Sequence, residues 1–262
     1  MGSSIFVPAV FPCVSDSRRF QLEKILAKDL SFSYQKGNEI LEHISFSLKE
    51  GESVGLIGAN GVGKSTLLKL LVGLVSGYEG SLTIDGLPVI KKNYKEIRKK
   101  VGYVFQDSES QLFLSTVYED VAFGPRNYGF PEEEVEKRVM EALKKVGLTD
   151  LKDRHIYRMS GGQKKLASLA TILSMEPEIL LLDEPSVVLD PKNRRNLIRI
   201  LNEIGSAKII ASHDLDFIMD TCKRTILLHD KKIIKDGDTM EILWDRKLLE
   251  ENGLELPLSL QR

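Results

Sequence analysis

Cysteine is scarce in this sequence, and net charge is almost absent. The 262 residues include two cysteines, Cys13 and Cys222, too few for a disulfide framework or a zinc site of the common four-ligand kind. Lysine and arginine number 37 against 38 aspartates and glutamates, so the formal net charge is −1. This balance gives no general electrostatic reason to bind nucleic acid or an anionic membrane surface, and we expect no nucleic-acid partner.

Long hydrophobic runs are also missing. No apolar stretch reaches the roughly 18 residues that a spanning helix needs, and the best candidate, residues 67–75, contains Lys69. The first 14 residues are apolar, but Pro8 and Pro12 interrupt them and no basic residue precedes them, unlike a signal peptide. We therefore expect residues 1–22 to be an N-terminal extension. The protein is expected to be soluble, or attached to a membrane only through partners.

The composition is that of a globular protein, with 42% hydrophobic and 29% charged residues. Beyond residue 22, short apolar strands alternate with helices, which predicts a layered α/β domain. Continuous apolar runs are typical of strands buried on both faces of a parallel sheet, whereas alternating segments predict a half-exposed antiparallel sheet. The candidates are residues 54–57, 101–105, 179–182, 208–211 and 225–228 for the parallel sheet, and 30–34, 44–48 and 81–85 for the antiparallel one.

Proline, glycine and aspartate mark the helix boundaries. Pro131 begins a helix with an apolar stripe, and Gly147 ends it. Asp190 and Pro191 supply an N-cap and a first-turn proline for another helix. Residues 106–160 lie between two core strands and have mainly helical character, so we expect an inserted helical lobe there.

The strongest chemical motif is residues 58–66, Gly-Ala-Asn-Gly-Val-Gly-Lys-Ser-Thr, between the predicted strand 54–57 and a predicted helix 66–74. This is the context of a phosphate-binding P-loop, in which backbone N–H groups and the helix N-terminus converge on phosphate oxygens. Lys64 would reach the β- and γ-phosphates, and Ser65 would coordinate Mg²⁺. A glycine-rich turn is the alternative. The predicted ATP-binding residues here are Asn60, Gly61, Gly63, Lys64, Ser65 and Thr66.

Two carboxylates, Asp183 and Glu184, end the apolar run 179–182. At the ligand edge of a parallel sheet, Asp183 would hold Mg²⁺ and Glu184 would polarise the attacking water. A strand ending in acidic residues is common in itself. Downstream of a complete P-loop, however, the pair indicates a nucleotide hydrolase.

A third motif, Ser160-Gly161-Gly162-Gln163, opens an apolar helix predicted over residues 166–175. By itself it is a good helix start, with serine as N-cap. Together with the P-loop and the two carboxylates, it resembles the ATP-binding cassette (ABC) ATPases over about residues 24–240. The resemblance implies a P-loop NTPase (RecA-like) fold: a parallel-sheet core with an N-terminal antiparallel β subdomain and a helical insertion. It implies an ATP-binding domain at 23–240, the insertion at about 106–165 and a C-terminal dimerisation segment at 241–262.

The same resemblance assigns roles that spacing alone does not. Ser160, Gly161, Gly162 and Gln163 match the ABC signature, which contacts ATP held by the opposite subunit, so two cassettes must meet head to tail. Gln106 matches the Q-loop glutamine, His213 the switch histidine and Tyr34 an adenine-stacking aromatic, although each has an ordinary structural alternative. The implied catalytic residues are Lys64, Gln106, Glu184 and His213, and the implied Mg²⁺ ligands are Ser65, Gln106 and Asp183.

Two further stretches resemble one branch of the family. Residues 106–113 and 119–125 are similar to ATPases of energy-coupling-factor (ECF) transporters, including cobalt, nickel and vitamin importers. Residues 248–257 resemble the C-terminal segment through which these ATPases pair. A polar surface loop and an amphipathic terminal helix are the generic alternatives. The branch implies that the helical lobe receives a separate membrane component, with exposed apolar groups near Leu112, Phe113 and Leu114.

Two departures from the family concern the dimer. Leu166 stands where arginine is frequent, and Val187-Val188 stands where Ala-Gly is usual in the D-loop, residues 186–190. A β-branched residue has less backbone freedom than glycine. We expect a second ABC ATPase subunit as partner, in either a homodimer or a heterodimer with a paralogue. The two departures favour the heterodimer.

The expected function is ATP hydrolysis, with Mg²⁺, that powers uptake of a vitamin or a transition-metal ion. A transmembrane coupling component and a substrate-binding membrane component would complete the importer, placing this chain peripherally on the cytoplasmic face of the cell membrane. The alternatives are a non-transport ABC ATPase acting on DNA or ribosomes, and a regulatory subunit without turnover. Against the DNA alternative, the 96 positions from Lys64 to Ser160 (160 − 64) leave no room for a long coiled-coil insertion.

Overall fold

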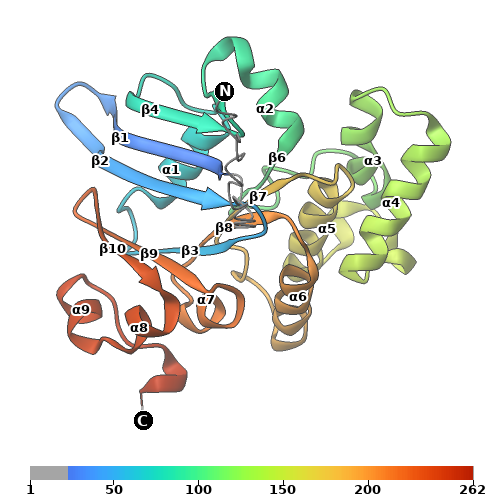
Figure 1. Cartoon of the computed structure of the whole chain (residues 1–262). Coiled ribbons are helices and arrows are strands. Elements are labelled where there is room, and N and C mark those ends of the chain that lie inside the picture. The colour runs from blue at the N-terminus through green and yellow to red at the C-terminus, as the bar shows by residue number, and fades with distance from the viewer. Residues whose placement is uncertain (1–22, 262) are drawn as a thin grey trace, which may run out of the picture.

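The computed structural model describes residues 23–261, so the predicted extension 1–22 and Cys13 lie outside the described residues. Within them, two sheets and a lobe of helices form the molecule (Figure 1). The six-stranded sheet has the order β10-β9-β3-β8-β7-β6 and the four-stranded sheet the order β2-β1-β4-β5. No helix in this part of the chain is long and apolar enough to cross a membrane.

The six-stranded sheet is parallel except for its edge strand β10, which pairs antiparallel with β9. The predicted fully buried strands are confirmed, because β7 and β8 are buried at every position. Alternate residues of β7 enter different clusters: Ile179 and Leu181 pack with α1, and Leu180 and Leu182 pack with α5 and α6. The strands are β3 (Ser53–Ile57), β6 (Val101–Val104), β7 (Ile179–Asp183), β8 (Ala207–Ala211), β9 (Arg224–His229) and β10 (Lys232–Asp238).

The predicted antiparallel sheet is also confirmed. Its long strands β1 (Glu23–Gln35) and β2 (Asn38–Lys49) pair antiparallel, and β4 (Glu79–Ile84) pairs with the other edge of β1. The short strand β5 (Leu87–Pro88) completes the sheet. One face packs with α1 and the core sheet while the other meets solvent, which explains the alternating sequence.

The inserted lobe contains α3 (Val117–Asn127), α4 (Glu132–Val146) and the start of α5 (Gly161–Leu173). These helices lie to one side of the core sheet (Figure 1). The apolar stripe of α4 is buried, and Gly147 ends the helix in the left-handed conformation, at φ 76°, as predicted. The remaining helices are α1 (Lys64–Leu71), α2 (Tyr94–Lys100), α6 (Pro191–Glu203), α7 (Leu215–Thr221), α8 (Thr239–Trp244) and α9 (Arg246–Glu251).

Two helices begin earlier than predicted. Helix α1 starts at Lys64 rather than 66, inside the P-loop, and it ends before Gly73, which has φ 63°. Helix α5 starts at Gly161 rather than 166, because Ser160 and Gln163 form a capping box at its first turn. The predictions followed the apolar periodicity, which begins only after the capping residues.

Candidate nucleotide-binding site

The P-loop connects β3 to α1 through backbone conformations that favour glycine. Gly58 has φ 149°, and a Cβ there would lie 2.3 Å from the Leu228 carbonyl oxygen. Gly63 has φ 110° and packs against Leu41 and Ile40 with no space for a side chain. The glycines therefore let the loop pack closely against Leu228, Leu41 and Ile40. The backbone N–H groups of the loop then lie at the start of α1, an arrangement that binds phosphate.

A cleft of about 500 Å³ lies over this loop. The ends of β6, β7 and β8 contribute further side chains to it, so segments far apart in the sequence meet at one edge of the core sheet. Nine of the predicted site residues line the cleft, together with Ile40 and Val187: Asn60, Gly61, Gly63, Lys64, Ser65, Thr66, Gln106, Glu184 and His213.

Lys64 is the buried cation of this cleft. Its Nζ donates to the carbonyl oxygens of Gly58 at 2.7 Å and Ala59 at 3.1 Å. Burial lowers the pKa of Lys64, although the carboxylates of Glu184 and Asp183 act in the opposite direction. The ammonium group is thus held at the loop, where it can attract phosphate oxygens.

Asp183 is fixed by two hydroxyl groups at the end of β7. Its Oδ1 accepts a hydrogen bond from the Ser65 hydroxyl at 3.0 Å, and its Oδ2 accepts one from the Tyr103 hydroxyl at 3.0 Å. Burial raises the pKa of Tyr103, and the Asp183 charge adds to this, so the phenol remains a donor. Sequence analysis missed Tyr103, whose aromatic character on a buried strand gave no sign of a polar role.

Glu184, which follows β7, lies beside His213, which follows the neighbouring strand β8. The His213 Nδ1 is 2.8 Å from the Glu184 Oε2, which also accepts from the His213 backbone N–H and the Ser212 hydroxyl, both at 3.3 Å. The backbone of Glu184 adopts φ 46°. Three donors around one buried carboxylate oxygen orient it toward the cleft. Ser212 was not predicted.

Tyr34 lies beside the P-loop helix. Its hydroxyl is 3.3 Å from the Thr66 hydroxyl, and its ring packs edge-to-face on Phe32, with the ring centroids 4.9 Å apart. The ring is more than half exposed, so one face is available to a planar group.

The residues predicted to form the signature, Ser160–Gln163, do not line the P-loop cleft of this chain. The Ser160 hydroxyl accepts from the Gln163 backbone N–H at 3.3 Å, and the Gln163 Oε1 accepts from the Ser160 N–H at 3.0 Å. Ser160 and Gly161 are exposed at the start of α5. The motif is a preformed helix terminus on the surface, separate from the P-loop.

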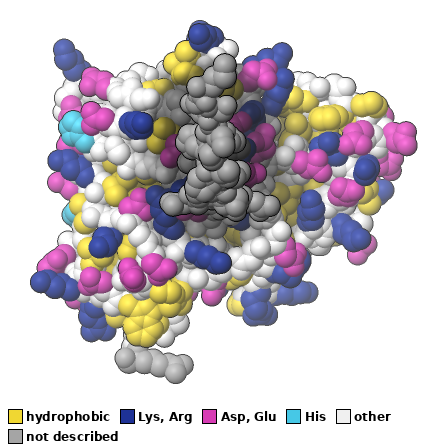
Figure 2. Space-filling view, viewed as in Figure 1, with side chains coloured by type: hydrophobic (Ala, Val, Ile, Leu, Met, Phe, Trp, Pro, Cys, Tyr) yellow, Lys and Arg dark blue, Asp and Glu magenta, His cyan; other side chains and the backbone are white. Residues whose placement is uncertain are grey.

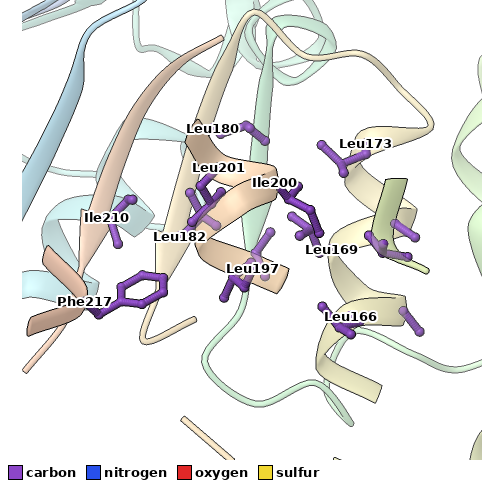
Figure 3. Packing of buried hydrophobic residues seen from close by; sticks show 14 of the residues in the cluster. Leu166, Leu169, Leu173, Leu180, Leu182, Leu197, Ile200, Leu201, Ile210 and Phe217 are labelled. Carbon is purple, nitrogen blue, oxygen red and sulfur yellow. The ribbon is translucent and has the colours of Figure 1, made fainter. Parts of the chain in front are cut away.

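Leu166 and Val188, which depart from the family's usual residues, lie in different environments. Leu166 is a core residue, on the same side of α5 as Leu169 and Leu173 and facing α6 (Figure 3). Val188 adopts φ 64°, the left-handed region, and its side chain is 66% exposed. A β-branched residue in this region is strained.

The predicted exposure around Phe113 is partly wrong. Phe113 is 63% exposed, but Leu112 is buried because it packs in the cluster that includes α3 and α5. Leu114 is half-buried. Lys165, which sequence analysis did not single out, is buried, and burial lowers its pKa to about 8, although Asp183 and Glu184 act against this.

A P-loop at the start of a helix, two carboxylates at the end of β7 and a mainly parallel core sheet, in which β8 separates β7 from the P-loop strand β3, define a nucleotide-hydrolysing P-loop protein. Residues 41–187 match the family model described as ABC transporter, so the chain belongs to this family of ATP-binding ATPases. The predicted P-loop NTPase fold and ATPase class are confirmed.

Several relatives of this chain are ATPases of energy-coupling-factor transporters. The chain is 43% identical to the energy-coupling factor transporter ATP-binding protein EcfA of Carboxydothermus hydrogenoformans, over 88% of this chain and 86% of that protein. The EcfA of Methanocaldococcus jannaschii is also 43% identical, over 88% of this chain and 84% of that protein. The predicted resemblance to the ECF branch is thereby confirmed.

Two solved structures share the fold. CbiO1 from Clostridium perfringens, part of the ABC transporter complex CbiONQ, has a TM-score of 0.78 and 35% identity, covering 87% of this chain and 94% of that one. The ATP-binding cassette MJ0796, a dimer in a post-hydrolysis state bound to ADP and phosphate, has a TM-score of 0.75 and 27% identity, covering 82% and 98%.

Proposed function

We propose that this chain is the ATP-hydrolysing subunit of an ECF-type importer and powers uptake of a vitamin or transition-metal ion through separate membrane components. The observation that best supports ATP hydrolysis is the 2.8 Å contact between the Glu184 Oε2 and the His213 Nδ1, in the same cleft as Lys64. The identity to EcfA proteins and to CbiO1 supports the importer branch.

In this proposal the phosphates of ATP lie on the P-loop amides and Lys64. Glu184 orients the attacking water and accepts its proton, since its Oε2 is held by donors from Ser212 and His213. His213 faces the same cleft and stabilises charge on the transferring phosphoryl group. Tyr34, beside Thr66, stacks on the adenine.

The oxygen donors at the end of β7 suit Mg²⁺. Ser65 and Asp183 place a hydroxyl and a carboxylate oxygen 3.0 Å apart, and Gln106 lines the same cleft, a donor set of hard oxygen atoms. These residues would hold the ion. When bound, it would neutralise negative charge on the β- and γ-phosphates.

A second cassette subunit would complete each site. Ser160–Gln163 form an exposed helix N-terminus outside this chain's own cleft, a terminus suited to a phosphate brought by a partner. Val188, in the D-loop of the proposed interface, favours a heterodimer with a paralogue. The C-terminal segment 241–262 adds dimer contacts: Trp244 is 63% and Leu258 78% exposed, and hydrophobic groups gather on the surface near the C-terminal end (Figure 2).

The membrane component would dock in an apolar groove beside the Q-loop. The groove, of about 330 Å³, lies between α3, α5 and the β6 strand. Phe113 and Phe123 form an exposed edge-to-face pair at its rim, with centroids 4.9 Å apart. Docking here places the chain peripherally on the cytoplasmic face of the cell membrane. Tyr128, Ile172 and Met175 also line the groove.

Substitution and co-purification test the proposal. Glu184→Gln should retain ATP binding but slow hydrolysis at least about a hundredfold, the size of a lost general base. The control Glu203→Gln changes an exposed carboxylate on α6 and should hydrolyse normally. A normal rate for Glu184→Gln would remove that residue from its role. Mild-detergent purification should also recover membrane proteins, and recovery of ribosomes or DNA alone would refute the importer.

A further inference from the structure

Lys165 is a buried cation on α5 that binds backbone rather than a carboxylate. The side chain is 2% exposed, on a helix whose other buried residues are almost all apolar or small. Its Nζ donates to the carbonyl oxygens of Phe105 and Gln106, both at 2.8 Å. Because burying an ammonium group is costly, two charge-assisted hydrogen bonds to consecutive carbonyls indicate a specific attachment.

Gln111 attaches the other end of the same loop to the same helix. Its Nε2 donates to the Ser168 carbonyl oxygen at 2.7 Å and to the Thr171 hydroxyl at 2.8 Å. Its Oε1 accepts from the Phe105 backbone N–H at 3.1 Å. Residues 105–111, hereafter the Q-loop segment, are therefore fastened to α5 at both ends.

This attachment lies between two functional surfaces. Gln106, at one end of the segment, lines the nucleotide cleft of this chain. Ser160, at the start of α5, is exposed outside that cleft. Lys165 lies five positions after Ser160, about 7.5 Å along a helix at 1.5 Å per residue. One rigid helical turn and a half therefore connects the two.

We propose that Lys165 is a positioning residue: it holds Gln106 at the nucleotide cleft and makes the Q-loop segment and α5 move as one body. A displacement of Gln106 at this chain's own ATP then reaches the signature residues that face the second cassette. The last step rests on the proposed function, whereas the attachment itself belongs to the single chain.

Amide hydrogen exchange on the full-length chain without nucleotide tests the attachment. Lys165→Met removes both donors at similar volume, so the Phe105, Gln111 and Leu112 amides, which bond within the segment, should exchange on the order of tenfold faster. Lys164→Met removes an ion pair between α5 and Glu109 of the same segment. It should change exchange little, because the Glu109 side chain is exposed and such pairs contribute little. Unchanged exchange in Lys165→Met overturns the proposal. If that variant does not fold, Lys165→Gln, whose shorter side chain does not span both carbonyl oxygens, carries the same prediction.

Steady-state hydrolysis tests the positioning role. Lys165→Met should lower kcat on the order of tenfold and change the KM for ATP by less than about threefold, since Lys64 and the P-loop stay intact. Lys165→Arg, which keeps donors for both carbonyls, should recover at least about a third of wild-type kcat. Equal kcat in Lys165→Met and wild type, or no recovery with arginine, refutes the role. A wild-type chain that hydrolyses no ATP refutes the proposed function and leaves the exchange result to decide the attachment.

Discussion

Replacing Val188 with glycine should stabilise the protein, which is an unusual direction for removing a hydrophobic side chain. Val188 adopts φ 64°. The left-handed region costs an L-residue roughly 1–2 kcal/mol, with β-branched residues at the upper end. Glycine adopts this region without that cost.

Two terms oppose the gain. Glycine gives the unfolded chain more conformational freedom, which costs about 0.5–1 kcal/mol. The valine side chain is 66% exposed, so removing it sacrifices only a third of its transfer free energy, about 0.5 kcal/mol. With about 2 kcal/mol of strain relieved, the net free energy of unfolding should rise by about 0.5–1 kcal/mol. For a chain of this size the melting temperature should rise by about 1–4 °C.

Val187 is a matched control, because it is adjacent and absent from the residues with positive φ. Val187→Gly relieves no such strain and loses partly buried surface, so its melting temperature should fall. Thermal unfolding of the two variants and wild type, followed by circular dichroism, makes the comparison. A melting temperature of Val188→Gly at or below wild type, or an equal rise in Val187→Gly, would refute the strain argument.

Three further substitutions test other parts of the structure. Tyr103→Phe leaves a buried oxygen of Asp183 without its donor and should lower the free energy of unfolding by about 1–3 kcal/mol in urea titration; an unchanged value would contradict the hydrogen bond. In the same titration, Leu166→Arg should lower the free energy of unfolding by about 3 kcal/mol or more, and Leu166→Met by less than about 1.5 kcal/mol. Equal free energies of unfolding in the two variants would show that residue 166 is not in the core. Phe113→Ser with Phe123→Ser should lower the free energy of unfolding by about 2–3 kcal/mol, because both rings are partly buried, and should leave the chain folded. The double variant should no longer co-purify with a membrane component, and retained co-purification would exclude this groove as its docking site.

The sheets, and the convergence of several candidate site residues in one cleft, could be predicted from the sequence for a physical reason. Continuous apolar runs such as residues 179–182 require burial on both faces, and a parallel sheet gathers the carboxyl ends of its strands at one edge. The P-loop residues Asn60 to Thr66, apart from Val62, therefore meet Glu184 and His213 once the strand order is fixed. The resemblance to ABC ATPases supplied the Q-loop, signature and switch assignments, which spacing alone did not.

Contacts that depend on the direction of individual side chains could not be predicted from the sequence. The Tyr103–Asp183 hydrogen bond joins residues 80 positions apart on adjacent strands, and an aromatic residue on a buried strand is ordinarily core. Leu112 was expected near the surface with Phe113, yet it is buried in the cluster that includes residues of α3 and α5, while Phe113 stays exposed. Lys165 offered one signal, a cation between apolar residues of a buried helix face, since such a position requires polar partners.

The arrangement of the site supports the proposed pairing with a second cassette. One chain holds its P-loop, Glu184 and His213 in a single cleft, while the capped terminus at Ser160 lies outside it. A helix N-terminus presents unpaired N–H groups and a favourable dipole to an anion, so leaving it exposed keeps it available to a phosphate on another molecule. A single chain therefore presents the cleft and the exposed helix terminus as two separate features of its surface. On the proposed function, ATP supplies the phosphate that both features bind, and closure of the pair becomes dependent on nucleotide.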